Sequence, residues 1–229
     1  MSEQRRFQLY GRRKAKPLRP RQQHLVDVLL PRLRIALRPG EKIAPLTLFA
    51  GPATDVWLEI GFGGGEHLAK LASSNPEIAF IGAEPFVNGV AKLLVAISDG
   101  KLANIRIFDD DVRLLLERLE SSTIGSVFIL YPDPWPKRRH EKRRLLNLQF
   151  IAELHRIMKP GAELRLASDS ADYVSSSLHN ILRHGGFDWL AEHPRDWRQP
   201  PAGWIETRYE SKALTQSRKP LYLSLRKLP

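Results

Sequence analysis

The order of apolar segments along the chain predicts an α/β protein with one mostly parallel, doubly wound sheet, helices on both faces and a late antiparallel strand. Short apolar runs alternate with segments whose apolar side chains recur at helical spacing. A glycine-rich turn joins the first run to the helical segment that follows it. The length of 229 residues suits one such domain and is short for two.

Each short apolar run is typical of a strand buried in the middle of a parallel sheet. The five expected parallel strands are 56–60, 78–83, 105–108, 126–131 and 162–167. Near the end of the sequence, Leu221, Leu223 and Leu225 alternate with polar neighbours, as in a half-exposed antiparallel strand.

Helical spacing begins near residue 22 with Leu25 and Leu29, and Pro31 interrupts it. Residues 40–54 have the composition of a loop. An amphipathic helix is expected after each parallel strand, around Leu68, Leu93, Leu115, Leu154 and Leu178. The helix around Leu154 is expected to stop at Pro160-Gly161, ahead of the fifth strand.

The composition favours a cytoplasmic protein with a polyanionic partner. The net charge is +11 and the pI is near 10.1, which favours attraction to nucleic acid phosphates. No cysteine is present, so disulfides, cysteine–zinc sites and thiolate nucleophiles are excluded. No apolar stretch resembles a membrane span or a secretory signal, and we expect no membrane association.

Residues 1–21 differ in composition from residues 22–229, which are predicted to form the folded domain. The first segment carries one acid, Glu3, and few apolar side chains. Its basic residues are Arg5, Arg6, Arg12, Arg13, Lys14, Lys16, Arg19 and Arg21. This composition predicts a flexible basic arm that is able to become ordered on RNA.

A glycine-rich turn follows the first expected strand and opens a helix. Gly61, Gly63 and Gly65 allow a tight turn and a close approach of the backbone to a ligand. A dinucleotide fingerprint would need a further glycine where this chain has Glu66, whose carboxylate would face the pyrophosphate. The turn therefore favours a nucleoside ligand without phosphate, such as S-adenosylmethionine.

Acidic residues follow the next two strands. Glu84 ends the second strand, where a carboxylate can accept both hydrogen bonds of a ribose diol. Asp109, Asp110 and Asp111 follow the third strand, where an acid can receive the exocyclic amine of adenine. The carboxyl ends of parallel strands form one edge of the sheet, so these acids and the glycine turn are expected to share a cofactor site.

The most distinctive segment, PDPWPKRRHEKRR at residues 132–144, directly follows the fourth strand. Its three prolines stiffen the loop that carries Asp133. Trp135 is either a stacking surface for a base or an indole packed on the domain. The basic run is predicted to anchor RNA phosphates through Arg138, Arg139, Lys142, Arg143 and Arg144.

This segment resembles the signature of the bacterial tRNA (guanine-N7)-methyltransferase family, often called TrmB, and the turn at Glu59–Glu66 resembles motif I of class I methyltransferases. The similarity covers most of residues 50–225. It includes Ala167-Ser168-Asp169 and the block Thr207-Arg208-Tyr209-Glu210. The sequence departs from some members at Ser211–Leu214, which leaves the role of that loop open.

The resemblance implies a Rossmann-like class I methyltransferase that transfers a methyl group from S-adenosylmethionine to N7 of a guanosine in tRNA, in the variable loop. It implies that the cofactor is held by Glu59, Gly61, Gly63, Gly65, Glu84, Asp111 and Asp133. Asp133 is also the expected catalytic residue, and Asp110 is the alternative to Asp111. The target nucleotide is expected to contact Lys137, Asp169, Thr207, Arg208, Tyr209 and Glu210.

The sequence disfavours three other functions. An amino-methyltransferase is disfavoured because the order Pro132-Asp133-Pro134-Trp135 breaks the Asn/Asp/Ser-Pro-Pro-aromatic pattern of those enzymes. A nicotinamide-dependent oxidoreductase is disfavoured by Glu66. A non-catalytic RNA-binding protein has no need for acids at three successive strand ends. The expected partner is tRNA, no metal is expected, and the oligomeric state, a monomer included, is left open.

Overall fold

The computed structural model describes residues 8–11 and 13–229. Arg5, Arg6 and Arg12 of the predicted basic arm lie outside the described residues. The described part of the arm, residues 8–11 and 13–19, precedes helix α1 and contacts the domain.

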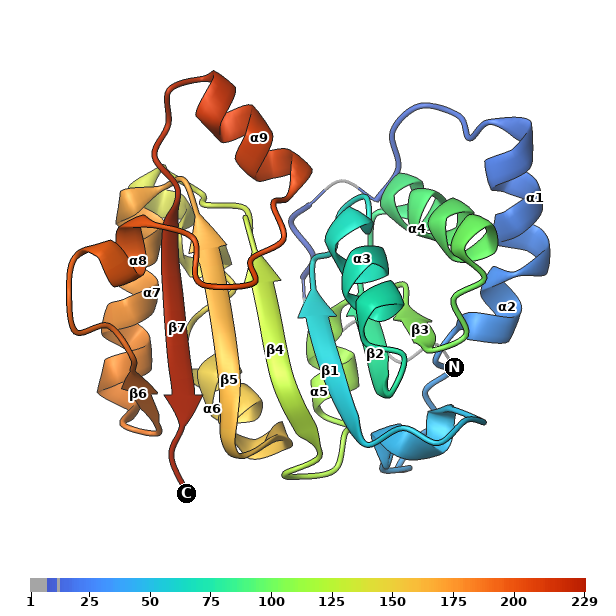
Figure 1. Ribbon diagram of the computed structural model, residues 1–229, viewed down its shortest axis with the longest axis horizontal. Coiled ribbons are helices and arrows are strands. Elements are labelled where there is room, and N and C mark those ends of the chain that lie inside the picture. The colour runs from blue at the N-terminus through green and yellow to red at the C-terminus, as the bar shows by residue number, and fades with distance from the viewer. Residues whose placement is uncertain (1–7, 12) are drawn as a thin grey trace.

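A seven-stranded sheet in the order β3-β2-β1-β4-β5-β7-β6 forms the centre of the molecule (Figure 1). Its strands are β1 (Asp55–Ile60), β2 (Ile78–Ala83), β3 (Ile105–Phe108), β4 (Ile124–Leu130), β5 (Met158–Ser168), β6 (Phe187–Trp189) and β7 (Leu221–Lys227). The first five strands pair in parallel, and β7 is antiparallel to both β5 and β6. The predicted α/β sheet with a late antiparallel strand is confirmed.

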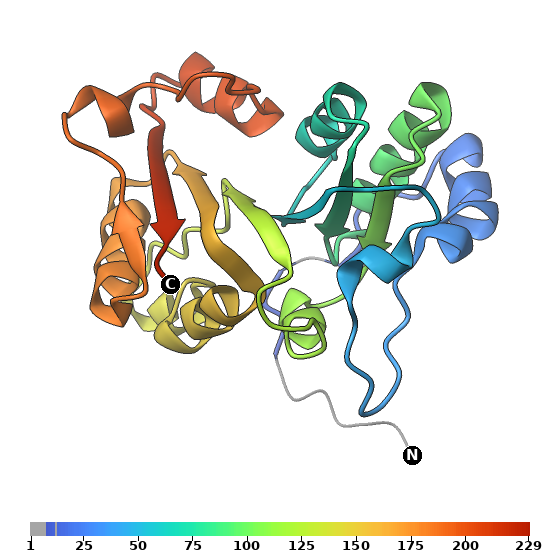
Figure 2. The same cartoon turned by 60° about the horizontal axis from the view of Figure 1, so that its bottom comes forward.

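Helices cover both faces of the sheet (Figure 2). The helical elements are α1 (Pro20–Val28), α2 (Leu30–Leu33), η1 (Pro45–Leu48), α3 (Glu66–Ser74), α4 (Val87–Gly100), α5 (Val112–Leu116), η2 (Arg138–Arg143), α6 (Leu148–Ile157), α7 (Ala171–His184), α8 (Arg195–Arg198) and α9 (Arg208–Thr215). Two large apolar clusters fill the two sides. One joins α5, α6 and α7 to the sheet, and the other joins α1 to α4 with β2 and β3.

A third, smaller cluster lies where no long helix covers the sheet. Phe128, Leu130, Ala167 and Tyr222 face the loop between α8 and α9, and Trp204 from that loop packs against them. This loop passes in front of β5 and β4, and α9 lies above the carboxyl edge of the sheet (Figure 1). The apolar contacts therefore hold the segment that carries the block Thr207–Glu210 against the domain.

The structure departs from the sequence prediction at the start of β5, and it contains short elements that were not predicted. Strand β5 begins at Met158 and passes through Pro160-Gly161, where a helix stop and a loop were expected. Gly161 has φ +79° there, and the pairing with β4 shifts register between Ile124 and Ser126. Strand β6 and helices α8 and α9 were not predicted, because each is too short to show a periodic apolar pattern.

Candidate active site

The carboxyl ends of β1 to β5 lie at one edge of the sheet (Figure 1). The chain order reverses between β1 and β4, which is the topological switch point where ligands bind in open α/β sheets. The glycine turn follows β1, Glu84 follows β2, Asp111 follows β3 and Asp133 follows β4. The fold thus brings the four predicted cofactor segments to one edge.

The glycine turn has a backbone that only glycine adopts easily. Gly61, Gly63 and Gly65 have φ of +73°, +55° and +78°. Helix α4 packs directly against the turn, since a Cβ added to Gly89 would lie 2.1 Å from the carbonyl oxygen of Gly63. Sequence reasoning missed Gly89; an isolated glycine within an otherwise apolar helix was the available signal.

Glu84 links the glycine turn to the start of α4. Its Oε2 accepts a 2.8 Å hydrogen bond from Gly63 N, and its Oε1 accepts a 2.9 Å bond from Phe86 N. The side chain is buried, with 8% exposed. Burial raises the pKa of Glu84, while the two amide donors act in the opposite direction.

Glu59 lies beneath the glycine turn and is already engaged within the protein. Its Oε2 is 2.7 Å from Nδ1 of His67, the second residue of α3, and both side chains are buried. The His67 ring packs against Phe128 and Trp204 at centroid distances of 5.4 and 6.2 Å. Sequence reasoning missed His67, although its spacing from Glu59 across a tight turn was a usable signal.

The acids after β3 all pair with arginines. Asp111 caps the N-terminus of α5 by accepting from Arg113 N at 3.1 Å, and it also binds the Arg113 guanidinium. Asp110 pairs with Arg13 at 3.1 Å, and Asp109 pairs with Arg34 at 2.7 Å. Asp111 is the most buried of the three. The structure brings Asp110 and Asp111 to the cofactor edge and leaves both as candidates for the adenine contact.

The proline-rich loop holds Asp133 between two unusual backbone positions. Tyr131 and Trp135 have φ of +53° and +42°, a region that side chains other than glycine rarely adopt. Arg144 Nε donates a 3.0 Å hydrogen bond to the carbonyl of Pro134 and braces the loop. Asp133 is exposed, and it follows β4, whose carboxyl end lies at the cofactor edge. Burial raises the pKa of Glu84 and of Tyr209, and the negative charge of Asp133 acts in the same direction.

The basic run divides into an exposed and a buried part. Lys137, Arg138, Arg139 and Lys142 are exposed on or next to η2. The Arg143 guanidinium packs against the rings of both Tyr10 and Trp135, 4.7 and 4.9 Å from their centroids. Arg144 is buried and binds Ser176 Oγ at 2.9 Å and the Asp172 carboxylate on α7. The exposed part is free to meet RNA, whereas Arg144 holds the loop to α7.

The burial of Arg144 and the exposure of Arg139 predict different effects on stability when each is replaced. Arg144→Ala is expected to destabilise the fold by roughly 1–3 kcal/mol, because it removes a buried donor and leaves the Pro134 carbonyl without this partner. Arg139→Ala, an exposed change in the same run, is expected to stay within about 0.5 kcal/mol of the wild type. Chemical unfolding of both variants measures the difference. Equal stabilities would show that Arg144 does not brace the loop.

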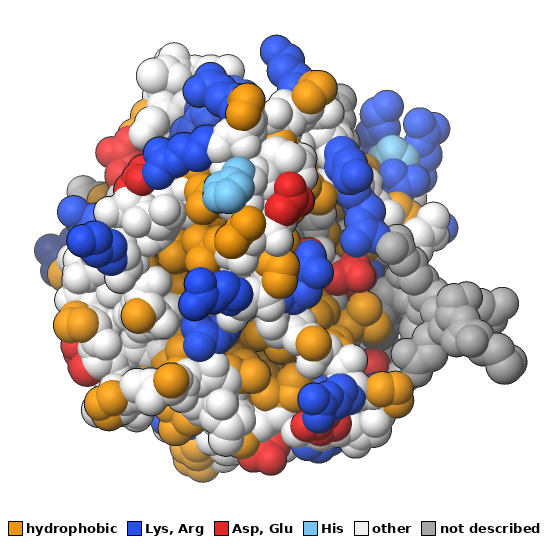
Figure 3. Space-filling model, turned by 90° about the vertical axis from the view of Figure 1, so that its right-hand side faces the viewer, with side chains coloured by type: hydrophobic (Ala, Val, Ile, Leu, Met, Phe, Trp, Pro, Cys, Tyr) orange, Lys and Arg blue, Asp and Glu red, His pale blue; other side chains and the backbone are white. Residues whose placement is uncertain are grey.

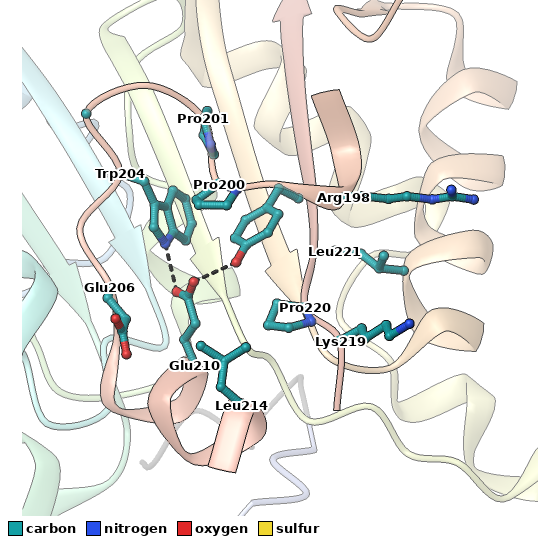
Figure 4. Close-up of a pocket in the computed structure, with 12 residues that line it drawn as sticks. Arg198, Pro200, Pro201, Trp204, Glu206, Glu210, Leu214, Lys219, Pro220 and Leu221 are labelled. Atoms are coloured by element: carbon teal, nitrogen blue, oxygen red, sulfur yellow. Dashed lines mark hydrogen bonds between the residues drawn. The ribbon is translucent and has the colours of Figure 1, made fainter. Parts of the chain in front are cut away.

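The block Thr207–Glu210 begins α9. Thr207 is its N-cap and accepts from Glu210 N at 3.1 Å. The Glu210 carboxylate is buried and accepts from Trp204 Nε1 at 2.7 Å and from Tyr222 Oη at 2.6 Å (Figure 4). These bonds fix the α8–α9 loop to β7 and orient α9.

Two residues of the block are exposed. Arg208 faces solvent, and 56% of Tyr209 is exposed although its ring lies over the glycine turn. A Cβ added to Gly63 would lie 3.1 Å from Cε2 of Tyr209. The last predicted substrate residue, Asp169, pairs with Arg218. Tyr209 is therefore the member of the block that lies nearest to the glycine turn.

A pocket of about 960 Å³ opens beside Glu210, between the α8–α9 loop and β7 (Figure 4). Trp204, Tyr222 and three prolines, Pro200, Pro201 and Pro220, line much of it. The Glu210 carboxylate borders this pocket and already accepts hydrogen bonds from two of the lining residues, Trp204 and Tyr222.

The site suits S-adenosylmethionine in its chemistry. The left-handed glycine turn allows the backbone to approach a ligand closely, and the carboxylates of Glu84 and Asp133 lie at the same edge of the sheet, where a sulfonium cation would be favoured. Within residues 8–11 and 13–229, no group of three or more His, Asp or Glu side chains is arranged to hold a metal ion. None of the described helices has the length and apolarity to cross a membrane.

The fold and this edge of the sheet define a class I methyltransferase. Among solved structures, the 16S rRNA methyltransferase KamB is similar in fold, with a TM-score of 0.59 and 18% identity over 82% of this chain and 95% of that one. A family model described as "Putative methyltransferase" matches residues 53–222. The chain belongs to the tRNA (guanine-N(7)-)-methyltransferase family.

Full-length relatives show this membership. The tRNA (guanine-N(7)-)-methyltransferase of Rhodospirillum rubrum is 47% identical over 96% of this chain and 88% of the relative. That of Agrobacterium fabrum is 47% identical over 98% of both chains. The resemblance drawn from the PDPWPKRRHEKRR segment is thereby confirmed.

Proposed function

We propose that this enzyme transfers the methyl group of S-adenosylmethionine to N7 of a guanosine in the variable loop of tRNA, in the cytoplasm. The observation that carries the proposal is the meeting of the glycine turn, Glu84 and Asp133 with an exposed basic segment at one edge of the sheet, in a member of this family. The cofactor site and the RNA-facing surface are continuous through the proline-rich loop.

Methyl transfer to guanine N7 requires no general base from the protein. Guanine N7 carries an in-plane lone pair and no proton, so its attack needs no deprotonation. S-adenosylmethionine, when bound, supplies an electrophilic methyl group on a sulfonium. As the purine gains positive charge, the exposed carboxylate of Asp133 stabilises it, because a fixed opposite charge favours the transition state over the ground state.

Within this proposal the remaining residues have separate roles. Glu84 receives the ribose diol, and Asp111 or Asp110 receives the adenine amine. Tyr209 stacks on the target base above the glycine turn, with Lys137 and Arg208 at its rim. Thr207, Glu210 and Asp169 act by holding α9 and the strand ends in place, as their bonds in this structure suggest.

Nucleoside mass analysis tests the product. Unmodified tRNA incubated with the enzyme and a labelled methyl donor is expected to yield labelled 7-methylguanosine. A transcript with the variable-loop guanosines replaced by adenosine is the matched control and is expected to remain unlabelled. Label on an exocyclic amine or on a ribose would overturn the proposed reaction.

RNA affinity tests the basic segment. The triple variant Arg138→Ala, Arg139→Ala, Lys142→Ala is expected to bind tRNA less tightly and with a weaker salt dependence. Each lost phosphate contact removes about 0.9 (duplex) or 0.7 (single strand) from the log–log slope. These three side chains are exposed, so their removal is expected to leave the fold intact. A salt titration with an unchanged slope would show that the segment does not meet phosphates.

A second basic surface lies on another side of the molecule. The side that carries α1, α2 and α4 displays more Lys and Arg than Asp and Glu side chains (Figure 3). Arg19, Arg21 and Arg32 belong to this region. This second basic surface lies away from the carboxyl edge and supports a long RNA substrate that contacts the molecule beyond the cofactor site.

A further inference from the structure

Residues 8–11 and 13–16 of the N-terminal arm cross the carboxyl edge of the sheet before the chain turns into α1 (Figure 1). Its hydrogen bonds and ring contacts reach three separate segments of the cofactor edge. These are the loop after β3, the proline-rich loop after β4 and the start of α4, which follows β2.

The first contacts are with the acids after β3. Arg13 Nη2 pairs with Asp110 at 3.1 Å. The carbonyl of Gln8 accepts a 3.0 Å hydrogen bond from the same Arg113 guanidinium that holds Asp111. The arm therefore touches both candidate acceptors of the adenine amine, one directly and one through Arg113.

The second contacts are with the proline-rich loop. The Tyr10 ring meets Trp135 edge-on at a centroid distance of 6.1 Å and stacks on Arg143. Gly11 lies next to Asp133, since a Cβ built on Gly11 would be 3.9 Å from Asp133 Oδ2. Arm residues thus contact the loop that carries the expected catalytic carboxylate.

The third contacts are with the N-terminus of α4, which has no side-chain cap of its own. Arg13 O accepts from Val87 N at 3.0 Å, and Asn88 exchanges hydrogen bonds with Ala15 N and Lys16 O at 2.9 and 2.8 Å. Because Gly89 presses α4 against Gly63, a shift of this helix start would move the glycine turn. The arm backbone takes the place of a cap here.

We propose that residues 8–11 and 13–16 form the outer wall of the adenosine part of the cofactor site, with Tyr10 and Arg13 as positioning residues. The inference rests on the proposed use of S-adenosylmethionine. The arm aligns the acids after β3 and the start of α4 with the proline-rich loop. When the arm is detached from the carboxyl edge of the sheet, the protein binds the adenosine part of the cofactor less tightly.

Cofactor titration tests the proposal in the full-length chain. The double variant Tyr10→Ala, Arg13→Ala is expected to bind S-adenosylhomocysteine about tenfold more weakly, which corresponds to the loss of about one hydrogen bond and one ring contact. 5′-Methylthioadenosine, which lacks the amino acid, is expected to lose the same factor, because the wall contacts the adenosine side. Replacing Arg13 by lysine in place of alanine keeps the charge opposite Asp110 and is expected to restore part of the affinity for S-adenosylhomocysteine.

Arg21→Ala is the matched control. Arg21 also forms an arginine–aspartate pair, with Asp99, but that pair lies on α1 and α4 away from the carboxyl edge. Its cofactor affinity is expected to equal that of the wild type. Thermal unfolding verifies that all the variants are folded.

Proteolysis gives a second readout that a general loss of stability would not produce. Trypsin cleavage after Arg13 and Lys14, followed by mass analysis, is expected to slow when S-adenosylhomocysteine is added to the wild type. Equal affinities for the wild type and the double variant, or cleavage that the ligand does not slow, would overturn the proposal. A wild-type chain that binds no S-adenosylhomocysteine would instead refute the proposed function.

Discussion

Replacing Asp133 by asparagine is expected to lower the rate of methyl transfer to tRNA by about 100- to 1000-fold, with little change in the affinity for either substrate. Asparagine keeps the shape of the side chain in the proline-rich loop but removes the charge that faces the developing purinium. Removal of one preorganised electrostatic group typically has an effect of this size. Single-turnover kinetics with saturating tRNA and cofactor separate this rate from binding.

Glu141→Gln is the control for this experiment. It removes one negative charge from an exposed position in η2, within the same segment. Its single-turnover rate is expected to match that of the wild type. A near-normal rate for Asp133→Asn would remove Asp133 from the centre of the reaction while leaving the reaction class intact.

Replacing Glu84 by alanine is expected to weaken S-adenosylmethionine binding by roughly 30- to 1000-fold, or about 2–4 kcal/mol, since a ribose diol loses two acceptors on a charged group. The variant also loses the two bonds that join Gly63 and Phe86 to this carboxylate. The affinity for RNA is expected to change little. Calorimetric titration of the folded variant measures the effect, and an unaltered affinity would contradict the assignment of Glu84 to the ribose.

The buried position of Glu84 adds a pH dependence. Burial raises the pKa of Glu84, and the ionised carboxylate is the form that accepts two hydrogen bonds. Cofactor affinity is therefore expected to be full above this raised pKa and to fall as the pH drops through it. In Glu84→Gln, which has no proton to gain, the affinity is expected to be lower and flat over the same range. A wild-type affinity for the cofactor that does not fall as the pH is lowered would contradict the role of the ionised Glu84 carboxylate.

The sheet and the cofactor edge could be predicted from the sequence because their signals are local. Buried parallel strands appear as short apolar runs, and β1, β2 and β3 begin and end within a residue of the predicted ranges. The three left-handed glycines follow from a turn that no other residue forms easily. Since parallel strands end at one edge of the sheet, the positions of the acids in the sequence are enough to predict that they lie close together.

The partners of the site residues could not be predicted in this way, because they depend on tertiary contacts. The sequence does not distinguish exposed Arg139 from buried Arg144, although both belong to one basic run. The exposed and buried faces of such a run are set by α7, which comes later in the chain. The pairing of Glu210 with Trp204 and Tyr222 likewise joins three segments that no local pattern connects.

The position of β7 has a consequence for biosynthesis. This strand follows the other six in the chain, yet it lies inside the sheet between β5 and β6. On the ribosome, the half of the domain with the glycine turn, β1 to β4, is able to form while β5 still exposes an unpaired edge. Among the named strands, β6 pairs only with β7, so it joins the sheet after β7 has been synthesised. A nascent chain is therefore able to acquire its nucleoside site before the sheet is closed, and its open β5 edge is the place where a chaperone would act.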